Sequence, residues 1–579
     1  GDHVAFVRGG NVHVVSLAQG APPALALTQG ASDQHFFGLA EFVAQEEMAR
    51  FEGMWWSPDG ARLAYAEVDE TEVARFAIAD PARPERPPQV FAYPRTGTAN
   101  ARVDLHVKTL PTEATASSTS PSVQAQWDHE RYPYLARVLW DNEAAPLAIL
   151  VQTRDQREAA LFAVDLETGR STLLVRESDP AWVNLERDLP RFLPQGAGLL
   201  WATEGQGART LELRGLDGTL SKELLPADSG FLSFVHALPD ASAIFVLIGD
   251  ALVNHLVRVD LASGARTVVV ASDGCDRTAT VARQGTCVLE TRTGPQRLPE
   301  TRLVFPDGHA MPVPSVAVAP PFRVNLSLVR TGGAQDFHAA LIRPRTFEAG
   351  RRYPVILHVY GGPHSLMVRA DERHYLLDQW LADRGAVVVA LDNRGTPRRG
   401  RDWERAVKCA FGDVPLDDQV AGLQALAARF PELDLTRVGV YGWSFGGYLS
   451  ALAALRRPDV FRVAVAGAPV VDWLDYDTHY TERYMDLPDA APEAYRAANL
   501  LTYARDLARP LLLIHGTADD NVYFFHSLKL ADALVRAGRP FEFLPLARVT
   551  HQLAEPAIRE AVWNRVAEFL FRHLDSDPA

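Results

Sequence analysis

The run Gly442-Trp443-Ser444-Phe445-Gly446-Gly447 carries the residue best suited to covalent chemistry in this sequence. It follows an apolar stretch at 438–441 and precedes a helical pattern at 449–455, so Ser444 is predicted on a sharp turn from strand to helix. Side chains at positions 442 and 446 would collide with that strand and helix, which explains the glycines there. The alternative is a glycine-rich packing turn without chemistry, but the flanking strand and helix favour a serine nucleophile.

A serine hydroxyl is a weak nucleophile and needs a base and an orienting carboxylate, which in this arrangement follow in the order Ser, Asp, His. Asp519 and Asp520 come just after a predicted strand at 511–515, and chemistry alone does not choose between them. Only His551 lies in a loop between the last predicted strand and the final helix at 558–574, so we expect it to be the general base. The other histidines downstream of Ser444 are His479, His515, His526 and His573.

The catalytic half resembles a known family through three motifs: GWSFGGY at 442–448, YTERYM at 480–485 and HGTADDNV at 515–522. In these motifs it is similar to the dipeptidyl peptidase IV branch of the prolyl oligopeptidase serine peptidases. The resemblance implies that the first aspartate of the ADDN run, Asp519, is the acid of the triad. One departure is that the family's histidine usually stands in an Asp-His-Gly setting, whereas here it reads Thr550-His551-Gln552.

The segment at 41–50 contains two adjacent carboxylates, Glu46 and Glu47. Without the resemblance, such a run next to an arginine is usually a solvated face. In the family, an equivalent Glu-Glu segment projects from a propeller and binds the free α-amino group of the substrate. Two carboxylates that hold a protonated amine would present only the bond two residues inward to the nucleophile. This pair favours an aminodipeptidase over an endo-acting oligopeptidase or an acyl-peptide hydrolase.

The resemblance also implies a small cavity for the second substrate residue and a donor for the carbonyl of the first, which is Asn521. Flat aromatic walls suit a pyrrolidine ring or an alanine methyl and exclude larger side chains. Without the motif, aromatic residues at this spacing indicate core packing. The residues that the resemblance places around the cavity are Val470, Trp473, Tyr476, Tyr480 and Val522.

Tyr360 closes a predicted strand in the run His358-Val359-Tyr360-Gly361-Gly362. The resemblance implies that its hydroxyl and the backbone N–H of Phe445 form the oxyanion hole, where one donor contributes about 3 kcal/mol of transition-state stabilisation. Otherwise a tyrosine at a strand end is a packing residue. The family's arginine that clamps the substrate carbonyl has no counterpart that we can assign in this sequence.

From about residue 353, strands alternate with long amphipathic helices, which predicts a mostly parallel sheet covered on both faces. We therefore expect an α/β-hydrolase catalytic domain at 323–579. The expected helices include 416–429 and 528–537. The expected strands are 355–360, 386–391, 437–441, 463–467, 511–515 and 541–546.

The first half consists of short apolar runs separated by turns, as at 4–7 and 12–15. Turn-plus-strand units recur at Pro194, Pro239 and Arg283, a period of about 45 residues that is typical of four-stranded propeller blades. We expect an all-β propeller at 1–322, with a Pro- and Val-rich linker at 310–322; the alternative is a large β-sandwich. Because the chain opens in mid-hairpin, the propeller is expected to lack upstream blades.

The composition restricts the partners. The 579 residues are 47% hydrophobic, and 58 Lys plus Arg against 72 Asp plus Glu give a net charge of −14, which argues against nucleic-acid binding. No HExxH, P-loop or GxGxxG motif is found, so we expect no metal and no cofactor. One disulfide, Cys275 to Cys287, is conceivable. The uncharged stretch at 438–455 contains four glycines and is predicted as buried core, not as a membrane span.

We therefore predict a serine exopeptidase that releases X-Pro or X-Ala dipeptides from free peptide N-termini through an acyl-enzyme, with the propeller as a size filter. The alternatives are an acylaminoacyl or endo-acting oligopeptidase on the same scaffold, and a non-catalytic relative that binds peptides. The presence of Ser444, Asp519 and His551 argues against the last. The resemblance implies a homodimer. A periplasmic location is expected if an upstream signal peptide has been removed, and a cytoplasmic one otherwise.

Overall fold

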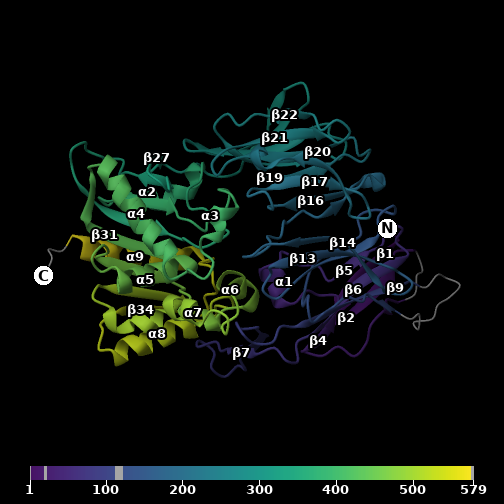
Figure 1. Cartoon of the computed structure of the whole chain (residues 1–579). Coiled ribbons are helices and arrows are strands. Elements are labelled where there is room, and N and C mark those ends of the chain that lie inside the picture. Colours follow the sequence, from purple (N-terminus) through teal and green to yellow (C-terminus); the bar gives the residue numbers. More distant parts are fainter. Residues whose placement is uncertain (1, 19–22, 111–121, 576–579) are drawn as a thin grey trace.

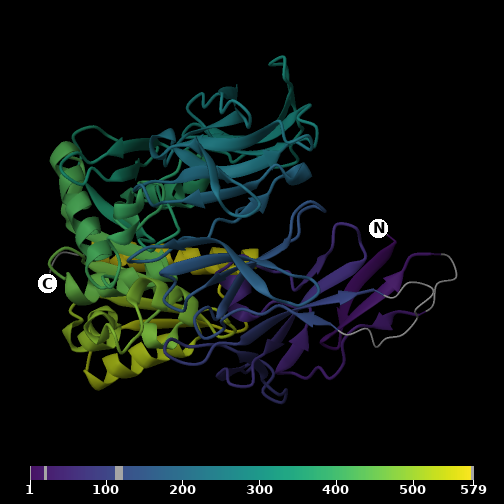
Figure 2. The same ribbon diagram turned by 45° about the vertical axis from the view of Figure 1, so that its right-hand side comes forward.

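The computed structural model describes residues 2–18, 23–110 and 122–575. Figures 1 and 2 show two parts side by side: the N-terminal part, purple to teal, consists of sheets, and the C-terminal part, green to yellow, has helices around a sheet. Short alternating apolar runs give the first part its strands, and longer helical periodicities give the second part its helices. The change from one pattern to the other occurs in the segment 313–325, which contains no strand or helix. We propose 1–322 and 323–579 as the two domains.

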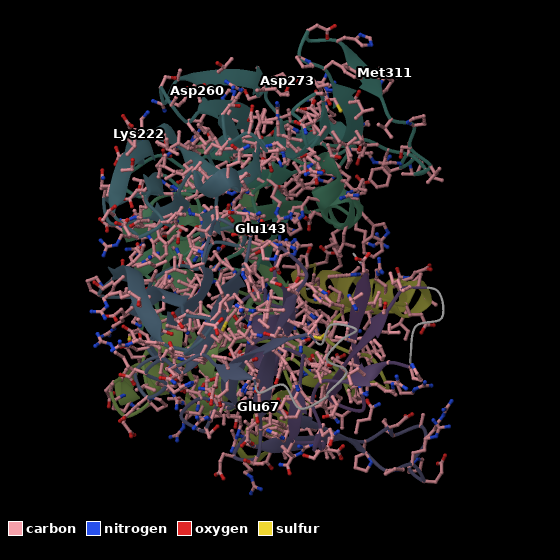
Figure 3. The ribbon with its side chains drawn as sticks, turned by 90° about the vertical axis from the view of Figure 1, so that its right-hand side faces the viewer. Glu67, Glu143, Lys222, Asp260, Asp273 and Met311 are labelled. Atoms are coloured by element: carbon pink, nitrogen blue, oxygen red, sulfur yellow. The ribbon has the colours of Figure 1, made fainter. Side chains whose placement is uncertain are left out.

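Within the described ranges, six antiparallel sheets of three to five strands follow one another along the N-terminal part, besides a two-stranded hairpin. Figure 3 shows their order: Glu67 lies toward one end of the molecule, Glu143 in the middle, and Lys222 and Asp260 toward the other end. The strands are β1 (His3–Arg8), β2 (Asn11–Ser16) and β3 (Leu25–Ala26); β4 (His35–Phe37), β5 (Met54–Trp56), β6 (Arg62–Asp69), β9 (Arg102–Thr109) and β10 (Val123–Gln124); β11 (Tyr134–Leu139), β12 (Leu147–Gln152), β13 (Glu158–Val164) and β14 (Ser171–Ser178); β15 (Arg191–Phe192), β16 (Leu199–Thr203), β17 (Thr210–Arg214) and β18 (Leu220–Leu225); β19 (Phe231–Ala237), β20 (Ala243–Gly249), β21 (Asn254–Asp260) and β22 (Arg266–Val270); β23 (Asp276–Val281), β24 (Val288–Gly294), β25 (Arg297–Val304) and β26 (Ala310–Pro312).

Neighbouring sheets share apolar cores, which is how propeller blades pack. For example, Leu135 of β11 and Ile149 of β12 pack with Val103 of β9, and Phe231 of β19 packs with Leu200 of β16. A two-sheet sandwich would have one core between two sheets, so the separate cores exclude that alternative and confirm the propeller.

The recurrent turns differ from the prediction in one respect. The turns at Pro194, Pro239 and Arg283 do not open a blade but join its first strand to its second. The period of about 45 residues is preserved, because the turn recurs once in each of these three blades. The hairpin predicted from 4–7 and 12–15 is confirmed as β1 and β2.

The C-terminal part is an eight-stranded sheet in the order β27-β28-β30-β29-β31-β32-β33-β34. The pairs from β30 to β34 are parallel, and β27 and β28 add an antiparallel edge. All six strands predicted from the sequence are present. The bounds are β27 (Leu326–Arg330), β28 (His338–Ile342), β29 (Tyr353–Val359), β30 (Val387–Asp392), β31 (Leu433–Trp443), β32 (Val463–Gly467), β33 (Leu511–Gly516) and β34 (Glu542–Leu546).

Helices cover both faces of this sheet, because alternate strand residues point to opposite sides and are apolar on both. One face packs on α4 (Val414–Arg429), α5 (Phe445–Arg456) and α8 (Phe525–Arg536), and the other packs on α2 (Leu376–Ala382) and α9 (Pro556–Leu574). The predicted helices at 416–429, 528–537 and 558–574 correspond to α4, α8 and α9. The stretch at 438–455 is buried in β31 and α5, as predicted.

A hairpin that the sequence did not reveal leaves the propeller and reaches the catalytic part. It consists of β7 (Arg75–Ile78) and β8 (Gln89–Ala92), and in Figure 1 β7 lies below α7 (Pro492–Ala498) and α6 (Thr478–Met485). Phe76 stacks on Phe525 at 5.4 Å between ring centroids, and the N–H of Thr96 donates to the carbonyl of Tyr476 at 2.8 Å. This arm therefore supports the segment that precedes α6.

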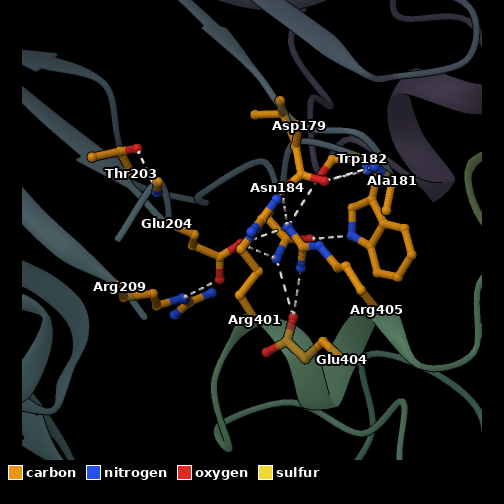
Figure 4. A network of polar contacts seen from close by, with 12 residues as sticks. Asp179, Ala181, Trp182, Asn184, Thr203, Glu204, Arg209, Arg401, Glu404 and Arg405 are labelled. Atoms are coloured by element: carbon orange, nitrogen blue, oxygen red, sulfur yellow. Dashed lines mark hydrogen bonds and ion pairs between the residues drawn. The ribbon is translucent and has the colours of Figure 1, made fainter. Parts of the chain in front are cut away.

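A charged network also joins the two parts at α3 (Arg401–Arg405), as Figure 4 shows. Arg405 Nη2 lies 2.7 Å from a carboxylate oxygen of Glu204 in the propeller. The Nδ2 of Asn184 donates to Glu204 at 3.0 Å and to Glu404 at 3.1 Å, so one amide bridges carboxylates from both parts. The network fixes how the propeller sits over the catalytic sheet.

Two further expectations have clear outcomes. Cys275 and Cys287 are both free cysteines, so the disulfide considered between them does not form. None of the helices within the described ranges combines the length and the apolar character that crossing a bilayer requires. The remaining α-helix of the described residues is α1 (Phe42–Glu46).

Candidate active site

Ser444 occupies the turn between β31 and α5 in a strained backbone conformation, with φ 60° and ψ −120°. A non-glycine residue rarely adopts such a positive φ, and the strain presents the side chain at the edge of the sheet. A Cβ at Gly442 would lie 2.3 Å from the carbonyl oxygen of Val359, and one at Gly446 would lie 2.2 Å from the same atom. Because this oxygen belongs to the adjacent strand β29 and cannot move aside, only glycine fits at these positions.

Asp519 and His551 are in direct contact: Nδ1 of His551 lies 2.7 Å from Oδ2 of Asp519. Asp519 follows β33, and His551 lies in the loop between β34 and α9. Asp520, the alternative acid, has an exposed side chain, whereas Asp519 is buried. Since Nδ1 faces the carboxylate, Nε2 is the nitrogen available to a serine hydroxyl.

Asp519 is held as an anion. Its Oδ1 accepts hydrogen bonds from the backbone N–H groups of Asn521 at 3.1 Å and Val522 at 2.9 Å. Burial alone would raise the pKa of Asp519, but the contacts with His515 and His551 outweigh it and lower this pKa to about 2. A carboxylate that stays charged can stabilise a positive charge on His551. His515, one of the downstream histidines not expected to be the base, thus also helps to keep the acid ionised.

The loop that carries His551 is fixed by Trp443 and Gly516. The indole N–H of Trp443 donates to the carbonyl of His551 at 2.8 Å. A Cβ at Gly516 would lie 2.1 Å from the carbonyl oxygen of Val549, so the loop packs directly on the backbone at the end of β33. The loop thus reaches Asp519 with Thr550 and Gln552 in place of the family's Asp and Gly. The role of Trp443 was not predicted.

A cavity of about 490 Å³ lies between the propeller and the catalytic part. Ser444, His551 and Tyr360 line it from the catalytic side, and Glu46 and Glu47 line it from the propeller side. The structure therefore brings the predicted nucleophile, base, oxyanion donor and carboxylate pair to one space. The other predicted residues on its wall are Tyr476, Tyr480 and Asn521.

Three residues predicted around the second substrate residue, Val470, Trp473 and Val522, are fully buried and do not line this cavity. Trp473 lies parallel to Tyr480 at 6.0 Å between ring centroids and supports it from behind. Tyr476 meets Tyr480 edge to face at 5.5 Å. Direct contact of Val470, Trp473 and Val522 with a substrate stays a prediction.

The segment 41–50, which carries the carboxylate pair, is not a fully solvated face, because Glu41 and Arg50 at its two ends are buried. Glu41 and Arg50 form an ion pair at 2.6 Å with both side chains almost fully buried, and Arg50 Nε also donates to the carbonyl of Leu135 in β11. Glu46 ends α1, and its Oε1 accepts a hydrogen bond from Asn521 Nδ2 at 2.6 Å. The pair is therefore fixed on a short helix that the propeller holds over the catalytic part.

Both carboxylates lie in an environment that disfavours their charge. Burial raises the pKa of Glu46 above its ordinary value, although His551 partly lowers it. Burial, followed by repulsion from Asp477 and Glu46, raises the pKa of Glu47 well above its ordinary value. Such a pair is complementary to a cationic ligand, which would relieve the repulsion and the cost of burial.

Tyr360 is suited to donate a hydrogen bond. Burial, with a contribution from the two glutamates, raises the pKa of Tyr360 to about 12, so its hydroxyl keeps its proton. Its ring lies 5.9 Å from that of Phe445, the first residue of α5, whose N–H belongs to the open amino end of that helix. The two predicted oxyanion donors thus belong to adjacent residues in space.

Arg483 belongs to the YTERYM motif, has no role predicted from the sequence, and lies on the cavity wall. Its Nε lies 2.5 Å from Oε1 of Gln156, and its Nη1 lies 3.1 Å from Nε2 of His364. Its Nη2 is buried and has no hydrogen-bond partner in the part of the chain that the structure describes. A buried donor without a partner on a cavity wall indicates a ligand acceptor. No sequence signal distinguished it, because its partners lie far away in the chain.

Comparisons with known proteins agree with this geometry. Residues 1–297 match the model of the dipeptidyl peptidase IV (DPP IV) N-terminal region, and residues 375–577 match that of the prolyl oligopeptidase family. The chain is 28% identical to dipeptidyl peptidase 8 of Mus musculus, over 99% of this chain and 75% of that protein. It is 24% identical to dipeptidyl peptidase 4 of Bos taurus, over 98% of this chain and 78% of that protein.

A solved structure is similar as well. The crystal structure of Porphyromonas gingivalis dipeptidyl peptidase 4 superposes with a TM-score of 0.89 and 25% sequence identity. The match covers 99% of this chain and 81% of that one, so it includes both the sheets of the N-terminal part and the catalytic sheet.

Proposed function

The chain belongs to the dipeptidyl peptidase IV branch of the prolyl oligopeptidase family, and from this premise we propose that it removes X-Pro and X-Ala dipeptides from free peptide N-termini. It is a serine-type dipeptidyl peptidase, as its relatives are. The observation that carries the proposal is that Glu46 and Glu47 line the same cavity as Ser444 and His551.

The first half of the proposed reaction forms an acyl-enzyme. Ser444 Oγ attacks the carbonyl carbon of the second substrate residue while His551 Nε2 takes the hydroxyl proton. Asp519, 2.7 Å from Nδ1, stabilises the resulting imidazolium. The tetrahedral oxyanion accepts hydrogen bonds from the hydroxyl of Tyr360 and the N–H of Phe445. The C–N bond then breaks, and His551 returns the proton to the leaving amine.

The second half hydrolyses the acyl-enzyme. A water molecule gives a proton to His551 Nε2 and attacks the acyl carbon through the same oxyanion arrangement. The bond between Ser444 Oγ and the acyl carbon breaks, Oγ regains the proton, and the dipeptide leaves with a free carboxylate. No other group is needed to balance this step.

The substrate amine is proposed to bind Glu46 and Glu47. Charge-assisted hydrogen bonds from an ammonium group are strong and directional, and this cation offsets the burial of the two carboxylates. Asn521 and the unpartnered Nη2 of Arg483 are the donors proposed for the carbonyl of the first residue. With the amine and this carbonyl fixed, only the bond after the second residue can reach Ser444.

The preference for proline or alanine in the second position is proposed to come from Tyr476 and Tyr480. Their edge-to-face rings form a flat, narrow wall backed by Trp473. A pyrrolidine ring or a methyl group packs on such a wall, whereas longer side chains do not fit.

An acylaminoacyl or endo-acting oligopeptidase is the alternative on this scaffold. Its substrates present no ammonium group two residues before the scissile bond, so the mutual repulsion and desolvation of Glu46 and Glu47 would have no cation to offset them. The experiment is to incubate the protein with a peptide that begins Gly-Pro and to identify the products by mass spectrometry. We expect release of Gly-Pro as the first product, and internal fragments would instead indicate an endopeptidase.

We also propose that the chain acts as a homodimer through α8. Leu528 and Val535 lie two helical turns apart on this helix and are 47% and 67% exposed, so they form an apolar face. Light scattering should give the mass of a dimer, and Val535→Glu should yield a monomer. A monomer in both cases would contradict the proposal.

A further inference from the structure

The loop after β29 carries a second cavity residue besides Tyr360. His364 has a left-handed backbone, with φ 67°, and its side chain lines the cavity. A residue other than glycine pays a conformational penalty at such a φ, so surrounding contacts must hold it there. The mechanism described above gives His364 no task.

The contacts of His364 lead to α6. Its Nε2 lies 3.1 Å from Arg483 Nη1 and also contacts the hydroxyl of Tyr484. Arginine can only donate, so this histidine nitrogen must be the acceptor and the imidazole must be neutral. Desolvation where His364 lines the cavity, together with the charge of Arg483, lowers the pKa of His364 to about 3, in agreement with a neutral ring.

The opposite side of the guanidinium is held from the propeller. Gln156, fully buried in the turn between β12 and β13, accepts from Arg483 Nε at 2.5 Å. The amide of Gln156 is itself oriented, because its Nε2 donates to the carbonyl of His479 at 2.5 Å. The guanidinium therefore lies between two acceptors from segments far apart in the chain, and the unpartnered Nη2 remains for a ligand.

We propose that His364 is a positioning residue for substrate binding: it accepts from Arg483 Nη1 and thereby holds Nη2 toward the carbonyl of the first substrate residue. Arginine has a long, flexible side chain, and a fixed guanidinium loses less freedom when the substrate binds. His364 and Tyr360 lie in the same loop. The contact between His364 and Arg483 therefore connects the loop of the proposed oxyanion donor with the arginine proposed to bind the first substrate residue. This inference rests on the function proposed above.

The test compares His364→Phe, which keeps the ring but removes the acceptor, with His364→Gln, whose amide oxygen can accept. The substrates are Gly-Pro p-nitroanilide and p-nitrophenyl acetate, an ester too small to reach Arg483. We expect His364→Phe to raise KM for the anilide about tenfold with little change in kcat, as loss of one hydrogen bond to a charged group predicts. His364→Gln should recover most of the loss. His309→Phe, the same replacement at an exposed turn, is the matched control.

Two further measurements distinguish positioning from a structural effect. Acetate hydrolysis should be unchanged in His364→Phe, since it needs Tyr360 and Ser444 but not Arg483. In an Arg483→Gln background, His364→Phe should add less than about a twofold loss, because the partner is already gone. Three results would overturn the inference: an equal loss of ester hydrolysis in His364→Phe, an undiminished effect of His364→Phe in the Arg483→Gln background, or no effect of His364→Phe on cleavage of the anilide. Failure of the wild-type protein to cleave the anilide would instead refute the proposed function.

Discussion

The amide of Asn521 donates to the carboxylate of Glu46 at 2.6 Å, across the boundary between the propeller and the catalytic part. The backbone N–H of Asn521 also donates to Asp519, the partner of His551. One residue thus connects the carboxylate pair that is proposed to bind the substrate amine with the acid of the triad. In the proposed function, the distance between the amine anchor and Ser444 decides where the peptide is cut, and we expect this distance to depend on Asn521.

Replacement of Asn521 should therefore weaken dipeptide cleavage. We expect Asn521→Leu to lower kcat/KM for Gly-Pro p-nitroanilide by about 10- to 100-fold, since it loses the contact with Glu46 and a donor for the substrate. Steady-state kinetics measure this, with the exposed neighbour Asp520→Asn as control. Equal rates for Asn521→Leu and the wild-type protein would contradict the role.

The carboxylate pair should be needed for peptides and not for small esters. Glu46→Gln together with Glu47→Gln should lower kcat/KM for the anilide by about 100-fold or more, because two charge-assisted hydrogen bonds to the amine are lost. Hydrolysis of p-nitrophenyl acetate should persist. Glu52→Gln, an exposed glutamate six residues after Glu46, is the control. A parallel loss of both activities would show that the pair acts on the catalytic residues instead.

The raised pKa of Glu47 predicts a specific dependence of stability on pH. In the folded protein Glu47 keeps its proton above pH 4.5, where an unfolded glutamate has lost it, so the folded state binds more protons. The free energy of unfolding contributed by this group therefore falls as pH rises through 4.5 toward the raised pKa. Glu47→Gln should be more stable than the wild-type protein at pH 8 and equal to it at pH 4. Thermal melting at both pH values checks this, and a constant difference would argue against the raised pKa.

Trp443 should act through the base. Trp443→Phe removes the hydrogen bond to the carbonyl of His551 while keeping an aromatic ring. We expect kcat to fall about tenfold for both the anilide and the ester, because a displaced imidazole affects every acyl transfer. Trp380→Phe on α2 serves as a control. A loss confined to the anilide would place the effect of Trp443 in substrate binding.

Arg405 should stabilise the contact between the two parts. Arg405→Gln removes the cation that lies 2.7 Å from Glu204 and 3.3 Å from Glu404, and it leaves Glu204 with only the weaker cationic contact to Arg209 at 3.9 Å. Breaking this buried pairing should cost about 3 kcal/mol of unfolding free energy. Arg457→Gln, which breaks the exposed pair with Asp459, should cost less than about 1 kcal/mol. Urea unfolding of both variants gives the comparison, and similar losses would contradict the buried role of Arg405.

The catalytic sheet was predictable because its signals are local. Alternating apolar residues define each strand, and the glycines around Ser444 reflect a turn that forms within a few residues. The blades were predictable from their period. The place of the recurrent turn within a blade was not, because a hairpin turn inside a blade has the same composition as a turn between blades.

The site was predictable only where motif residues act themselves. Ser444, Asp519 and His551 follow one another in an order that the chemistry requires. Gln156 and Arg483 are 327 residues apart, and no local pattern reveals that they meet. The same holds for Trp443 and His551, which are 108 residues apart. The contact between Trp443 and His551 depends on packing within the catalytic part. The contact between Gln156 and Arg483 depends on how the two parts pack, which the β7–β8 arm and the network at α3 support.

The most direct test of the account measures the need for a free amine. Gly-Pro p-nitroanilide and its N-acetylated form are incubated at neutral pH with the wild-type protein and with Ser444→Ala, and nitroaniline release is followed. The account predicts that the wild-type protein cleaves only the free-amine substrate and that Ser444→Ala cleaves neither. Cleavage of the acetylated substrate at a comparable rate would contradict the anchoring of the amine by Glu46 and Glu47.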